Sequence, residues 1–206
     1  MSAISTNTYA PLTIPPAMQS KLAKIGITQF WDLILHLPLR YEDETHLYPI
    51  ADCPNGQQLQ VEGDIIHQEV QYRPRRQLLC QLQDGTGVLH LRFLNFYPSQ
   101  LKQLAVGQRI RALGEVRHGF YGAEMVHPKC NSVGIASPLA ESLSPIYPTT
   151  ASLSQTHLRR LIGQALLKAD LHDTLPAALV ERLGLPAFAE SIRYLHQPPP
   201  DAHKAS

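Results

Sequence analysis

The apolar residues of this chain recur with two different periods, which divide the sequence into three parts. Up to about residue 56 their spacing is helical, and it is helical again from residue 136 onward. Between these limits apolar and polar positions alternate, which is typical of half-buried strands. The pattern predicts an α+β protein with a mostly β core, preceded by a helical hairpin and followed by C-terminal helices.

The first helical part is predicted to be a hairpin of two short helices within residues 17–56, after a flexible lead-in at residues 1–16. Gly26 can end the first helix, Thr28 can cap the second, and Pro38 stops it. Two interpretations of this hairpin are open. It can hold a DNA phosphate on backbone N–H groups at a helix N-terminus, or it can serve only for packing. Packing is favoured because no second glycine shapes an anion-binding turn.

The alternating part, residues 57–135, has the element order of an OB-fold. A tight-turn sequence, Asp84-Gly85-Thr86-Gly87, separates two of its alternating runs. A short helix is predicted at residues 98–104 and the last strand at residues 121–130. Five strands with a helix between the third and the fourth predict a five-stranded OB-fold barrel.

The second helical part, residues 136–197, starts with a connector rich in Gly, Ser and Pro. Ser152 and Gln155 have the spacing of a capping box, and an apolar stripe follows them. The remaining predicted elements are two shorter helices and a linker or tail, at residues 175–183, 187–195 and 198–206.

Composition narrows the class of protein only slightly. The net charge is +1, and the only basic excess lies in residues 57–135, with nine Lys/Arg against six Asp/Glu. The three cysteines lack the spacing of a zinc site or a disulfide framework. The N-terminus has no signal-peptide pattern, and no apolar run reaches the roughly 20 residues of a membrane span. We therefore expect a protein of the reducing cytoplasm without a membrane partner.

Motifs for catalysis are absent from the sequence. It contains no Gly-Lys dipeptide and therefore no phosphate-binding P-loop, and neither H-E-x-x-H nor G-x-S-x-G occurs. The ten histidines are dispersed and lack metal-ligand spacing. We expect no catalytic residues, no metal site and no cofactor in this chain, so binding is the better interpretation.

An OB barrel offers a groove where bases stack on aromatic side chains and Lys/Arg contact phosphates. The candidate DNA contacts are Arg73, Arg75 and Arg76 in the first loop of the barrel; Arg92, Phe93, Leu94, Asn95, Phe96 and Tyr97 at the end of its third strand; and Arg109, Arg111 and Arg117 on one face of its fourth strand. For Phe93, a place in the core is the favoured alternative. For Phe96 and Tyr97, stacking on a base and packing under the next helix are both open. The arginine loop is a phosphate contact or else a solvated hairpin end.

Four motifs carry a resemblance to a known family. They are Leu33-Ile34-Leu35-His36-Leu37-Pro38-Leu39-Arg40-Tyr41-Glu42-Asp43, then Asp84-Gly85-Thr86-Gly87 with Leu91-Arg92-Phe93-Leu94-Asn95-Phe96, then Tyr121-Gly122-Ala123-Glu124-Met125-Val126-His127-Pro128, and Leu143-Ser144-Pro145-Ile146-Tyr147-Pro148-Thr149-Thr150. In order and approximate spacing the chain resembles, from about residue 22 to residue 200, the wedge region of the RecG family of bacterial ATP-dependent DNA helicases.

The resemblance implies a module that meets the branch point of a replication fork or Holliday junction during recombination, repair and fork reversal. In the family an aromatic pair stands at the positions that match Phe93 and Leu94, and an asparagine that matches Asn95 follows it. This chain therefore departs from the family at the second position, where it has leucine. It also places the motor domains, with their ATP and magnesium, beyond residue 206, and suggests the single-strand-binding protein as a partner. The alternative hypothesis is a non-catalytic OB-fold module that binds protein or RNA, which the near-neutral charge supports.

Overall fold

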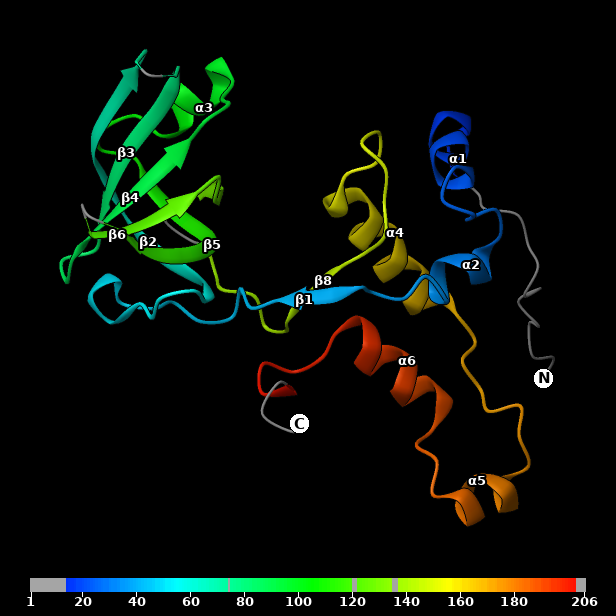
Figure 1. Cartoon of the computed structure of the whole chain (residues 1–206). Coiled ribbons are helices and arrows are strands. Elements are labelled where there is room, and N and C mark those ends of the chain that lie inside the picture. Colours follow the sequence, from blue (N-terminus) through cyan, green and yellow to red (C-terminus); the bar gives the residue numbers. More distant parts are fainter. Residues whose placement is uncertain (1–13, 74, 120–121, 135–136, 203–206) are drawn as a thin grey trace. The chain divides into compact units, whose positions relative to one another are not determined.

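The computed structural model describes residues 14–73, 75–119, 122–134 and 137–202, and it divides the chain into two units (Figure 1). The barrel unit is Asp43–Glu141, and the helical unit joins Met1–Glu42 to Ser142–Ser206. The described part of the predicted lead-in is residues 14–16, because residues 1–13 lie outside the described ranges. The helical hairpin and the C-terminal helices thus belong to the same unit.

The barrel unit is built on a sheet with the order β2-β3-β4-β6-β5-β7 and an additional pairing between β2 and β5. Its strands are β2 Gln58–Gln71, β3 Gln77–Gln83, β4 Val88–Phe93, β5 Arg109–Gly119, β6 Gly122–Val126 and β7 Lys129–Ser132. All these pairings are antiparallel except that of β4 with β6. The pairings join β2, β3, β4, β6 and β5 in a ring, which is the strand order of an OB barrel. The predicted mixed fold with an OB-like β core is confirmed.

The last predicted strand, residues 121–130, is wrong as a single element, and Tyr121 lies outside the described residues. The structure has two strands there, β6 and β7, which pair with different stretches of β5. The break falls at His127, which has a φ of 52°, and at Pro128, which has no N–H to donate to a sheet.

Alternation places one face of each strand in the barrel core. Leu89, Leu91 and Phe93 of β4 are each at most 1% exposed, as the alternation predicts. Burying a side chain of this size stabilises the fold by about 1.5–3 kcal/mol. Gly63 lies where β2 passes close to the end of β3, and a Cβ there would be 2.4 Å from the Gln83 carbonyl oxygen. Only glycine fits this bend of the barrel.

The same unit contains the short helix α3, Pro98–Gln103, and the 3-10 turn η1, Ile50–Asp52. The helix follows β4, where the sequence predicts it, and the Gln68 amide donates to the Leu101 carbonyl at 2.8 Å. This bond joins α3 to the far half of β2. The turn η1 is held by Asp84, whose carboxylate accepts the Ile50 N–H at 2.8 Å.

The helical unit consists of α1 Pro16–Ala23, α2 Phe30–Ile34, α4 Gln155–Lys168, α5 Ala177–Leu183 and α6 Phe188–His196, with a two-stranded sheet of β1 Arg40–Glu42 and β8 Ser144–Ile146. Its core joins residues far apart in sequence, such as Leu22, Ile34, Ile162 and Ile192. The sequence did not predict the pairing of β1 with β8. The strand just before the barrel unit in sequence thus pairs with the strand just after it.

Two predicted helix caps are wrong by one or two residues. The N-cap of α4 is Ser154, not Ser152, and Gln155 instead exchanges two hydrogen bonds with the backbone of Tyr147. The N-cap of α2 is Gln29, not Thr28.

The helical hairpin is now better explained by packing than by phosphate binding. The Asp32 carboxylate accepts the N–H groups of Thr28 at 2.7 Å and Gln29 at 2.8 Å, and these bonds lower its pKa against the opposing effect of burial. The Asp32 carboxylate thus occupies the two N–H groups directly before α2 and places a negative charge where a phosphate would bind.

Candidate nucleic-acid interface

Two loops of the barrel unit converge beside α3. One is the end of the β2–β3 hairpin, and the other joins β4 to α3. The guanidinium carbon of Arg76 lies 4.4 Å from the centroid of the Phe96 ring, a cation–π contact that joins the two loops. We call this surface the recognition rim and define it as Tyr72, Arg73, Arg75, Arg76, Leu94, Asn95, Phe96 and Tyr97.

The recognition rim exposes aromatic and apolar surface. Tyr97 is 75% exposed, Tyr72 is 71% exposed and Leu94 is 47% exposed. Phe96 differs, because it is half-buried and packs against the barrel core. A base can stack on exposed aromatic side chains next to positive charge, as Tyr97 and Tyr72 are here.

The three arginines of the rim are exposed. Within the described ranges, no carboxylate forms an ion pair with Arg73, Arg75 or Arg76. Their charge is therefore available to a phosphate, and Arg76 keeps its planar group over Phe96 while its edge can still donate.

The segment that carries Tyr97 is held by local bonds. The Tyr97 N–H donates to the Gln100 side-chain oxygen at 2.9 Å, which caps the first turn of α3. Pro98 follows at the first position of the helix, where its missing N–H costs nothing. The Tyr97 side chain takes no part in these bonds and stays free to contact a ligand.

The other predicted arginines have partners inside the barrel unit. Arg92 pairs with Glu124 at 2.8 Å, and Arg117 pairs with Glu115 at 3.1 Å. The Nε of Arg92 is buried, and it has no hydrogen-bond partner in the described part of the chain. Arg92 lies on β4 and Arg117 on β5, outside the two loops that form the rim, so neither belongs to it.

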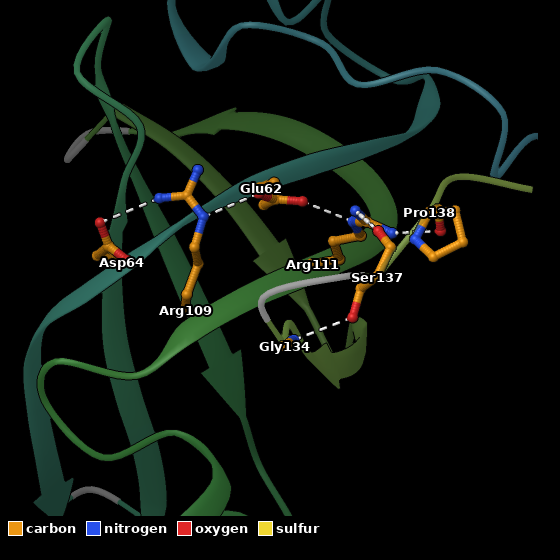
Figure 2. Close-up of polar contacts among 7 residues, drawn as sticks. All are labelled: Glu62, Asp64, Arg109, Arg111, Gly134, Ser137 and Pro138. Atoms are coloured by element: carbon orange, nitrogen blue, oxygen red, sulfur yellow. Dashed lines mark hydrogen bonds and ion pairs between the residues drawn. The ribbon is translucent and has the colours of Figure 1, made fainter.

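Arg109 and Arg111 form a network on the neighbouring strand β5 (Figure 2). Both donate to Glu62, at 2.8 and 2.6 Å, and Arg109 also reaches Asp64 at 3.3 Å. Burial alone would raise the pKa of Glu62, but the bonds from the two arginines outweigh burial and lower the pKa.

Arg111 is the more enclosed of the two arginines, with its side chain 16% exposed. It also donates to the carbonyl of Pro138, at 2.9 Å, and to that of Ser137. Its guanidinium therefore anchors the segment after β7 to the barrel, as Figure 2 shows. We assign Arg111 a structural role, in place of the phosphate contact that the sequence suggested.

The structure divides the predicted contacts into two groups. Arg73, Arg75, Arg76, Leu94, Asn95, Phe96 and Tyr97 lie together in the rim. Phe93 is 1% exposed, so its ring has no surface to offer a base and is a core residue. Sequence analysis missed Tyr72, although an aromatic directly before an arginine-rich loop was a signal that could have identified it.

Other kinds of site find little support in the part of the chain that the structure describes. There, no three His, Cys, Asp or Glu side chains gather closely enough to hold a metal ion. The described helices are too short or too polar to cross a membrane. An OB-like barrel with exposed arginines and aromatics on one rim belongs to the class of binding modules.

Comparison with known proteins names the family. The RecG wedge domain model matches residues 12–168, so the chain belongs to the RecG wedge domain family. The chain is 44% identical over 189 residues to the ATP-dependent DNA helicase RecG of Escherichia coli (strain K12), covering 89% of this chain and 27% of that protein. It is 40% identical over 200 residues to RecG of Pasteurella multocida (strain Pm70), covering 93% of this chain and 29% of that protein.

A solved structure of RecG bound to a three-way DNA junction has the same fold. It aligns with a TM-score of 0.71 and 22% identity, covering 97% of this chain and 28% of that one. The chain thus spans less than a third of the length of these relatives.

Proposed function

We propose that this chain is the branched-DNA-binding wedge module of a RecG-like ATP-dependent DNA helicase that acts in recombination, repair and fork reversal. The observation that carries the proposal is the recognition rim, where exposed aromatics lie together with arginines that form no ion pair with a carboxylate of the described residues, on an OB-like barrel. Its substrates are replication forks and Holliday junctions.

The rim suits a branch point better than a continuous duplex. Arg73, Arg75 and Arg76 contact phosphates, which any DNA shape offers. The faces of bases are available only where pairs end or open, and there Tyr97 can stack. Leu94 cannot stack as a plane, but it can enter a base step as an apolar wedge.

Membership of the family supports this function. RecG of Escherichia coli is an ATP-dependent DNA helicase, and a related RecG has been solved with a three-way DNA junction. We infer that the module divides strands while motor domains, which use ATP and magnesium, move the DNA. We assign no residue of this chain to the single-strand-binding protein, a partner that rests on the resemblance alone.

We also propose that the protein is located in the cytoplasm. The described cysteines, Cys53, Cys80 and Cys130, are free thiols, a state that a reducing compartment maintains. Burial raises the pKa of the Cys80 thiol to about 12, so this group is unreactive near neutral pH.

Fluorescence anisotropy tests the proposal directly. The chain is titrated against a labelled fork, a linear duplex of equal length and an RNA fork, each at two salt concentrations. The proposal predicts the tightest binding to the DNA fork and a loss of affinity with salt. Equal affinity for the DNA fork and the duplex would contradict branch recognition, and preference for the RNA fork would favour the alternative of an RNA-binding module.

A further inference from the structure

His127 has an unusual backbone conformation. Its φ is 52°, and it is the only residue other than glycine with a positive φ within the described ranges. This left-handed conformation is costly for a residue with a Cβ, and histidine adopts it only where the surroundings hold it there. The contacts that hold His127 in this conformation are therefore informative about its role.

His127 contacts three consecutive residues at the end of β4. Its N–H donates to the Arg92 carbonyl at 2.8 Å, and its ring meets the Phe93 ring edge-on at a centroid distance of 6.1 Å. Its Nε2 accepts the N–H of Leu94 at 3.3 Å. The pairing of β4 with β6 ends at Arg92 and Val126, so His127 continues the connection by one step beyond the sheet.

The other side of His127 is fixed to the barrel. Pro128 follows it and is buried. Gly114 of β5 makes room for this proline, because a Cβ at Gly114 would lie 3.2 Å from the Pro128 Cβ. The imidazole is therefore attached to a rigid part of the molecule, whereas the segment it holds, Leu94 to Tyr97, forms half of the recognition rim.

We propose that His127 is a positioning residue for DNA recognition: its imidazole Nε2 accepts the Leu94 N–H and so sets the direction in which residues 94–97 leave β4. This inference rests on the proposed function of the rim. Because Leu94 is exposed, water can replace the bond at little cost in stability. What is lost without the bond is the fixed geometry of the contacting side chains, on which recognition depends.

Two substitutions separate the imidazole acceptor from the backbone conformation. Among residues with a Cβ, asparagine tolerates a positive φ well, but it is too short to reach Leu94. Glutamine places a side-chain oxygen near the position of Nε2. We expect His127→Asn to lower the ratio of fork to duplex affinity by about fivefold, because residues 94–97 lose their fixed geometry, and His127→Gln to retain most of the ratio.

The control is His172→Asn, a change to an exposed histidine of the helical unit, which should leave the ratio at its wild-type value. If both His127 variants keep the wild-type ratio, or both lose it equally, the imidazole does not act as an acceptor for Leu94. If the wild-type chain itself shows no preference for forks, the proposed function fails instead. Amide exchange of Leu94 then tests the inference without DNA: it should be faster in His127→Asn than in His127→Gln.

Discussion

Replacing Tyr97 with alanine should weaken fork binding without unfolding the protein. The side chain is 75% exposed, and the bond that caps α3 uses the Tyr97 backbone N–H, which alanine retains. Tyr97 is the N-cap of α3 but caps it through its main-chain groups, so this change resembles an ordinary surface substitution, which alters the free energy of unfolding by no more than about 0.5 kcal/mol. We therefore expect Tyr97→Ala to have a nearly unchanged melting temperature.

The expected loss of binding is much larger. Stacking of one base on an aromatic side chain contributes about 1–3 kcal/mol by alanine substitution. Since about 1.4 kcal/mol corresponds to a tenfold change in affinity, the dissociation constant for a fork should rise by about 5- to 150-fold. A linear duplex offers few open base faces, so its dissociation constant should change far less.

Fluorescence anisotropy with a labelled fork and a labelled duplex measures both values, and circular dichroism checks the melting temperature. Tyr194→Ala is a matched control, because Tyr194 is 50% exposed on α6 of the helical unit. Phe96 is a poorer target, since it packs on the barrel core and contacts Arg76. Unchanged fork affinity in a folded Tyr97→Ala variant would refute the stacking role.

Three further predictions concern charge, shape and pH. Arg75→Ala combined with Arg76→Ala should weaken binding to every DNA shape and make the slope of log affinity against log salt less steep by about 2; an unchanged slope would show that these arginines do not contact phosphates. Leu94→Phe should strengthen fork binding by about fivefold, and anisotropy that shows no gain would mean that another residue occupies the wedge position. Burial lowers the pKa of His196 below 6.5, although the Ile34 carbonyl opposes this effect. The unfolded chain therefore takes up a proton before the folded one, and the free energy of unfolding in urea should fall as pH drops below about 6.5. The free energy of unfolding of the His196→Gln variant should fall less over the same pH range. An equal fall would contradict the assignment of this pH dependence to His196.

Much of the barrel could be predicted, because an alternation of apolar and polar residues identifies half-buried strands. Leu89, Leu91 and Phe93 show this pattern clearly, and each is buried as expected. The break between β6 and β7 was harder to predict, because it depends on the left-handed backbone conformation of His127, which no local sequence pattern indicates. The pairing of β1 with β8 joins segments about a hundred residues apart, and such contacts leave no periodic signal in either segment.

The binding site was only partly predictable for a related reason. Sequence identifies an arginine but not its partner, and the partners of Arg109 and Arg111 come from a neighbouring strand. Glu62 lies between the two arginines and pairs with both, and Arg111, the more enclosed of the two, has a structural role. Among the described residues no carboxylate pairs with the rim arginines, and a sequence cannot show this difference. Parity along β4 did place Leu94 outward, and this was the most useful local clue to the rim.

Hydrogen–deuterium exchange with and without fork DNA tests the central claim most directly. The account predicts slower exchange in the peptides that contain the recognition rim, residues 72–76 and 94–97, and much weaker protection by a linear duplex at the same phosphate concentration. Protection confined to the helical unit, or to the β5 face around Arg109 and Arg117, would contradict the assignment of the rim as the surface that meets the branch.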